Sequence, residues 1–192
     1  MKTRQDPARS GITRRELLLK MGSGLVALTV SSSWGEITPA QARAARLALR
    51  NLSVAEGRTL EAWGDVLLPG AREAGITNYV DDQLSRDNPS FILKYLDYVG
   101  SYLKFYRQGL HSLERYSRTR YGRSFARLTS EHQVNLVRTL SQQSPRGWSG
   151  PPAPLFYFVT RNDAVDVYYG TVEGFARLDI PYMAQLLPPA KW

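Results

Sequence analysis

The sequence predicts an all-α protein with a single folded domain. Apolar side chains recur at three- and four-residue intervals along most of the chain, which is the spacing that places them on one face of a helix. Residues that favour helix starts and ends flank these segments, and no linker separates two folded regions. The apolar run at residues 155–159 has strand propensity, but it lacks a partner strand elsewhere in the chain, so we interpret it as part of a helix.

Three helices are expected in the first half of the domain. Ser53 and Glu56 form a capping box that begins the first of them, and Pro69-Gly70 ends it. A short second helix is expected from Ile76 to Leu84. The third is the longest, from about Ser90 to Tyr121.

The apolar side chains of this long predicted helix cover more than half of its circumference, which is wider than the stripe of a typical surface helix. Burial in the core is the favoured interpretation, and coverage by another protein is the alternative. Tyrosine suits a surface where the ring is buried and the hydroxyl stays hydrated. The candidate partner interface therefore consists of Tyr95, Tyr98 and Tyr102.

Basic and apolar segments complete the domain. The arginines between Arg115 and Arg127 predict a solvated face, with an acidic partner surface or phosphate head groups as the alternative. A helix should begin at Ser130, and residues 144–154 form a loop. The next helix runs to Tyr169, and an irregular tail containing Pro181, Pro188 and Pro189 follows. The predicted architecture is a helical bundle with this tail.

The N-terminus has the pattern of an export signal. A basic start is followed by an uncharged stretch from Met21 to Gly35, which is too short and too mildly apolar to span a membrane. We assign residues 1–44 to a twin-arginine signal peptide with its cleavage region, and residues 45–192 to the helical domain. The alternative is a disordered basic arm. The motif residues are Thr13, Arg14, Arg15, Leu17, Leu18 and Lys20, and the candidate cleavage residues are Ala42 and Ala44.

Composition removes several classes of function. The absence of cysteine excludes disulfides, thiolate metal sites, iron–sulfur clusters and covalently attached c-type haem. Half of the net charge of +8 lies in residues 1–44, which disfavours a nucleic-acid-binding domain. Two histidines, His111 and His132, are too few to favour a metal or haem site. We interpret Asp163 and Asp166, three residues apart on a helix, as a solvated pair rather than an acid–base pair. No catalytic constellation and no cofactor site is expected in this chain.

Several short segments occur in an order that matches a known family. They are Leu60 to Gly70, Ala71 to Ile76, Tyr79 to Asp81, Tyr106 to Leu110, Tyr121 to Thr129 and Tyr169 to Phe175. In this order, and behind a twin-arginine leader, they resemble the gluconate 2-dehydrogenase subunit 3 family, the small subunits of flavin-dependent sugar and alcohol dehydrogenases.

The resemblance implies a non-catalytic subunit bound to a large dehydrogenase subunit that contains FAD and passes electrons to a cytochrome c. It also implies that the small subunit carries the export signal, so the twin-arginine translocase would bring both chains to the periplasm or to the periplasmic face of the inner membrane. The alternative is a free-standing secreted helical binding protein or enzyme.

Overall fold

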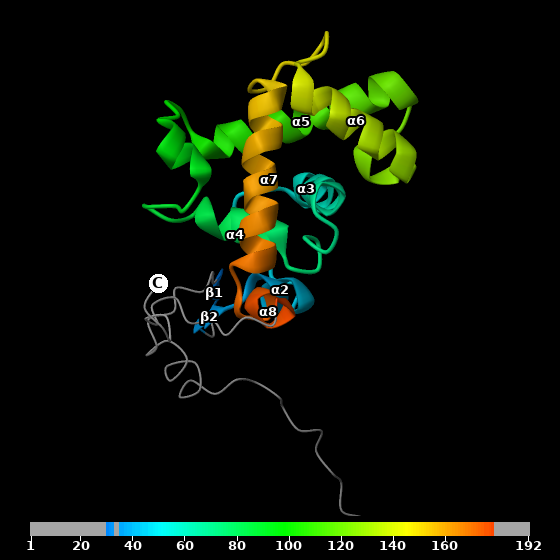
Figure 1. Ribbon diagram of the computed structural model, residues 1–192. Helices are drawn as coiled ribbons and strands as arrows, with labels where there is room; N and C mark the ends of the chain where they lie inside the picture. Colours follow the sequence, from blue (N-terminus) through cyan, green and yellow to red (C-terminus); the bar gives the residue numbers. More distant parts are fainter. Residues whose placement is uncertain (1–29, 33–34, 179–192) are drawn as a thin grey trace, which may run out of the picture.

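Helix α7 (Ala153–Tyr169) is the axis on which the other elements pack (Figure 1). The computed structural model describes residues 30–32 and 35–178. Besides the 3-10 helix η1 (Ile92–Leu96), five α-helices of the described chain pack on α7, and they come from residues 54 to 177. They are α3 (Val54–Leu67), α4 (Ile76–Gln83), α5 (Tyr102–Tyr121), α6 (Ser130–Gln142) and α8 (Val172–Arg177). The predicted all-α fold is confirmed.

One end of α7 carries a group of small elements from both ends of the described chain (Figure 1). Strand β1 (Val30–Ser32) pairs antiparallel with β2 (Gly35–Ile37), with Val30 opposite Ile37. Helix α2 (Pro39–Ala44) follows directly and packs on β1 and α4, while α8 packs on the end of α7. The elements β1, β2, α2 and α8 have no counterpart among the predicted ones.

The helix boundaries follow the capping residues closely. Ser53 and Glu56 form the predicted capping box: the Glu56 amide donates to Ser53 Oγ at 3.2 Å, and the Ser53 amide donates to Glu56 Oε2 at 2.7 Å. Thr129 caps α6, and its Oγ1 accepts from the amide of His132. The run at residues 155–159 is helical, as predicted, because it forms the first turns of α7.

The predicted long helix from Ser90 to Tyr121 is wrong, because the chain breaks in its first third. A 3-10 helix, η1 (Ile92–Leu96), ends at Asp97, which has a left-handed φ of 49°. Asp is one of the few residues that tolerate this conformation. A new helix, α5, then begins with Ser101 as its cap. Gly100 and Ser101 favour such a break, because Gly is a poor helix former and Ser is a good N-cap.

The core is centred on the indole of Trp63 in α3. Trp63 is fully buried, and its Nε1 donates to Thr160 Oγ1 of α7 at 2.7 Å. Its ring stacks on Phe156 at 5.8 Å and meets Phe125 edge-on at 5.5 Å between centroids. Gly109 lets α5 approach this group, because a Cβ there would lie 2.3 Å from the Phe156 ring. These contacts join α3, α5 and α7 into one core.

Two predicted regions fall outside the described residues. The twin-arginine motif lies within residues 1–29, and most of the proline-containing tail lies within residues 179–192. Helix α8 begins at Val172, two residues after Gly170, whereas an irregular tail is predicted to follow Gly170. Within residues 30–32 and 35–178, no helix is both long and apolar enough to cross a membrane.

Candidate functional site

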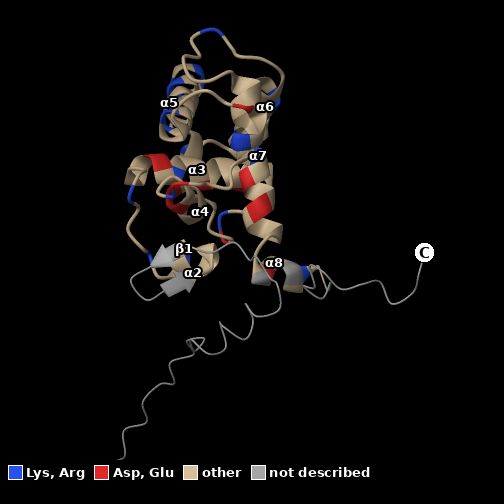
Figure 2. Ribbon diagram, turned by 90° about the vertical axis from the view of Figure 1, so that its left-hand side faces the viewer, with Lys and Arg blue, Asp and Glu red and all other residues tan. Residues whose placement is uncertain are grey.

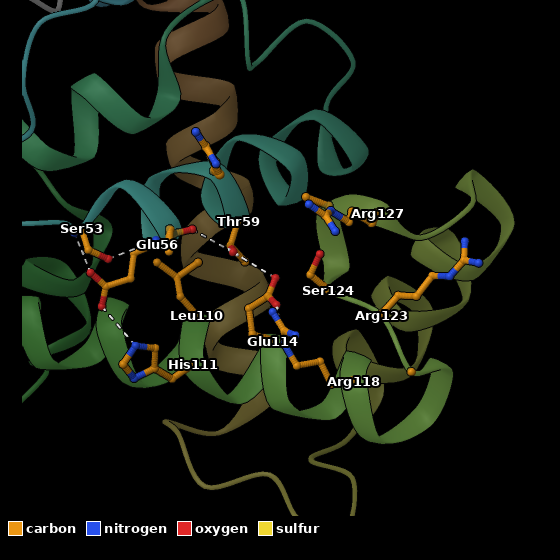
Figure 3. Close-up of a pocket in the computed structure, with 14 residues that line it drawn as sticks. Ser53, Glu56, Thr59, Leu110, His111, Glu114, Arg118, Arg123, Ser124 and Arg127 are labelled. Atoms are coloured by element: carbon orange, nitrogen blue, oxygen red, sulfur yellow. Dashed lines mark hydrogen bonds and ion pairs between the residues drawn. The ribbon is translucent and has the colours of Figure 1, made fainter.

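A groove of about 690 Å³ opens between α3, α5 and the short 3-10 helix η2 (Phe125–Arg127), as Figure 3 shows. Two glutamates line its inner side, Glu56 from α3 and Glu114 from α5. Exposed arginines surround its opening, and basic residues continue along α5, whereas acidic residues lie on α4 and α7 (Figure 2). The arginines of the groove are Arg58, Arg118, Arg123 and Arg127.

Glu56 is buried by the helix start that it caps. Besides the Ser53 amide, its carboxylate faces two side chains of α5: Arg107 Nε lies 3.7 Å and His111 Nε2 lies 3.4 Å from Oε1. The His111 side chain is 74% exposed, so this pair is open to solvent on one side. The Ser53 hydroxyl accepts the capping hydrogen bond from the Glu56 amide.

Glu114 joins the three elements that form the groove. One carboxylate oxygen, Oε1, accepts from Thr59 Oγ1 of α3 at 3.0 Å and from the Phe125 amide of η2 at 3.1 Å. The other, Oε2, lies 3.5 Å from Arg118 Nε. Glu114 therefore holds α3, α5 and η2 together, which is a structural role.

The arginines of the groove make it suitable for binding an anion. Both of its carboxylates already have partners, and within the described chain Arg58, Arg123 and Arg127 form no ion pair. A carboxylate or phosphate group could therefore approach these guanidinium groups without displacing a protein partner. In the described part of the chain, no group of three or more His, Asp or Glu side chains is arranged to hold a metal ion.

A second polar group lies in the core, where Asp163 of α7 is almost fully buried. The interpretation of Asp163 as a solvated residue is therefore wrong, because Asp163 lies on the buried face of α7 together with Val159 and Val167. Tyr106 Oη donates to Asp163 Oδ2 at 2.7 Å. Asp163 Oδ1 and Tyr79 Oη are buried with no hydrogen-bond partner among the described residues.

Burial dominates the protonation of this core group. It raises the pKa of Asp163 to about 8, although the hydrogen bond from Tyr106 acts in the opposite direction. Burial also raises the pKa of Asp166, and it raises the pKa of both Tyr79 and Tyr106 well above the usual range. The hydrogen bond between Tyr106 and Asp163 joins α5 to α7 inside the core, where Asp163 is only 1% exposed.

The three tyrosines of the candidate interface occupy different environments. Tyr98 packs edge-on against Phe105 at 5.3 Å, and Tyr102 meets Phe91 edge-on at 5.8 Å, so both rings border the core. Tyr95 is 72% exposed. The break at Asp97 separates Tyr95 from the other two. Leu96 and Val99, on either side of the break, are exposed, and the exposed fraction of Val99 is 98%.

A family model for gluconate 2-dehydrogenase subunit 3 matches residues 54–184, which is more than half of the chain. The chain belongs to this family. It is therefore related to a subunit of a dehydrogenase complex, as the resemblance of the sequence segments implies. No curated protein and no solved structure gives a match.

The structure gives physical roles to the segments on which the resemblance to subunit 3 rests. Asp81, which ends one of them, is buried and accepts hydrogen bonds from the amides of Arg50, Asn51 and Leu52 at 2.7–2.8 Å. Gly174 lies against the end of α7, where a Cβ would be 2.2 Å from the Tyr168 carbonyl oxygen. Asp81 and Gly174 therefore have structural roles, and these roles explain why the two residues occur in the segments that resemble the family.

Proposed function

We propose that this chain is the non-catalytic small subunit of a periplasmic FAD-dependent sugar or alcohol dehydrogenase. In this role it escorts the folded flavoprotein through twin-arginine export and stabilises it afterwards. The observation that carries the proposal is the match of residues 54–184 to the subunit 3 family. The paired arginines Arg14 and Arg15 support the export role, because the motif around them has the spacing of a twin-arginine signal.

The proposed division of labour places the chemistry in the partner. The large subunit would bind FAD and oxidise the sugar or alcohol, and a cytochrome c would accept the electrons. Twin-arginine export carries proteins that are already folded, which suits a partner whose FAD is inserted in the cytoplasm. A subunit with the only leader would then serve both chains, and the complex would work in the periplasm or on the periplasmic face of the inner membrane.

Deletion of this chain tests the escort role. The flavoprotein is expected to stay in the cytoplasm when it is produced alone, and to reach the periplasm when both chains are produced together. Cell fractionation followed by a dye-linked dehydrogenase assay and FAD fluorescence measures this directly. Equal flavoprotein activity in the periplasm with and without this chain would contradict the proposal and favour a free-standing secreted protein.

The exposed residues Tyr95, Leu96 and Val99, which we call the η1 surface, are the proposed contact with the flavoprotein. Exposed aromatic and aliphatic side chains are typical of the centre of a protein interface. Replacing Tyr95 and Val99 together by serine should weaken binding to the flavoprotein at least about tenfold, because the apolar contact is lost. Affinity can be measured by titrating the purified partner in a co-purification or interferometry assay.

Two control variants separate binding from folding. The change Val134→Ser removes an exposed apolar side chain from α6, away from the η1 surface, and should leave the affinity unchanged. The change Tyr98→Ala removes a ring that packs on Phe105 and should lower the melting temperature, unlike the double serine variant. Unchanged affinity in the double variant would exclude the η1 surface as the contact.

A further inference from the structure

Helix α2 is part of the folded domain, although it lies within residues 1–44, the predicted signal peptide and cleavage region. Ala42 is fully buried, and Pro39 is buried beside it. Thr38 and Gln41 form a capping box at the start of the helix, with bonds of 3.1 and 3.2 Å. The helix packs on α4 and β1. A local helix with its own cap is thus buried against the core.

Side-chain contacts join α2 to parts of the chain that are distant in sequence. Thr38 Oγ1 donates to Glu173 Oε1 of α8 at 2.9 Å, across 135 residues. Arg43 Nε lies 3.2 Å from Glu61 Oε1 of α3 and donates a hydrogen bond to it. Both partners are half-buried and belong to the region that matches the subunit 3 family. The region that matches the family therefore contacts α2 through side chains of α3 and α8.

The start of α4 is shaped to receive α2. Gly75 precedes α4 with a left-handed φ of 85°, and a Cβ at this position would lie 2.2 Å from the carbonyl oxygen of Pro39. Glycine is therefore required at this position for two reasons: the left-handed backbone conformation and the close approach of α2. Farther along, the Asp81 carboxylate fixes the amides of residues 50–52, so the chain after α2 is also held to the domain.

We infer that α2 is retained in the mature subunit, so that neither Ala42 nor Ala44 is the processing site. A peptidase needs several residues of extended, accessible backbone. Here the Ala42 amide donates to the Thr38 carbonyl at 2.9 Å, and the Leu47 amide donates to the Ala42 carbonyl at 3.1 Å. Cleavage after either alanine would require α2 to leave α4 and lose these contacts. Any cut that releases the leader therefore lies before Thr38.

This inference rests on the proposed function, because it concerns the export leader. It adds that the leader is joined to α2, which packs against the folded domain. The N-terminal residue of the exported subunit tests it. Intact-mass measurement and N-terminal sequencing of the protein from the periplasm should show a chain that still contains residues 38–44. A mature chain that begins at Arg43 or Ala45 would overturn the inference.

A second experiment does not depend on export, so its failure is distinct from failure of the escort role. Purified full-length chain is incubated with purified signal peptidase, and the products are identified by mass. The folded wild type should resist cleavage after Ala42 and Ala44, whereas Gly75→Ala, which displaces Pro39, should be cut at one of them. The matched control is Gly122→Ala: Gly122 also has a left-handed φ, of 69°, but open space around its Cβ position, and the variant should resist cleavage. Cleavage of the folded wild type at either alanine would overturn the inference.

Discussion

Replacing Arg14 and Arg15 together by lysine should leave both this chain and its flavoprotein partner in the cytoplasm. The change keeps the charge of the leader but removes two planar guanidinium groups, whose fork of donors a lysine ammonium cannot reproduce. A receptor that recognises the arginine pair should therefore reject the variant. A general secretory signal would tolerate it, because that route requires positive charge and an apolar segment.

The measurement is fractionation of cells that produce both proteins, with detection of each chain and of dehydrogenase activity in the periplasm. We expect the periplasmic activity to fall to the background level. The matched control exchanges Arg4 and Arg9 for lysine, which changes two leader arginines outside the motif and should preserve export. Normal periplasmic flavoprotein activity while export of this chain is blocked would exclude the escort role.

The sequence predicts most of the helices because their signals are local. The capping box at Ser53 and Glu56 and the helix start at Ser130 depend on residues a few positions apart, and both predictions are confirmed. The break after η1 is not predicted, because the apolar spacing continues past it and gives a stronger signal than Gly100 and the capping potential of Ser101. Periodicity identifies apolar positions, but it does not show whether one helix carries them all.

The missed features of the sites depend on contacts between distant residues. Helix α2 is only six residues long, and its partners Glu173 and Glu61 lie on α8 and α3, so no local pattern indicates that it is folded. The groove between α3, α5 and η2 likewise exists only after packing. By contrast, the family could be identified from the sequence, because its segments are recognised by their order along the chain.

Asp163 makes the stability of the subunit depend on pH. Its pKa is about 8 in the folded protein, above the ordinary 3.8 that it regains on unfolding. Between pH 4 and 8 the unfolded chain therefore releases a proton that the folded chain retains, and the free energy of unfolding falls as the pH rises. One such proton changes it by about 1.4 kcal/mol per pH unit. The surrounding groups Tyr79 and Tyr106 have raised pKa values and stay neutral in this range, even with Arg86 acting on Tyr79.

The change Asp163→Asn should remove most of this dependence. Asparagine still offers an oxygen to the Tyr106 hydroxyl, without a charge to bury. We expect the variant to gain on the order of 3 kcal/mol over the wild type between pH 4 and pH 7. Urea unfolding at pH 4, 5, 6 and 7 measures the two slopes.

The control Asp166→Asn distinguishes this buried acid from its neighbour on the same helix. Asp166 is only half-buried, and burial raises its pKa in the same direction, so its removal should flatten the pH dependence less than that of Asp163. Equal slopes in the wild type and Asp163→Asn would mean that Asp163 is ionised in the folded core. In that case the tyrosine hydroxyls around it would have to stabilise a buried carboxylate, and Tyr106→Phe should then cost far more at pH 7 than at pH 4.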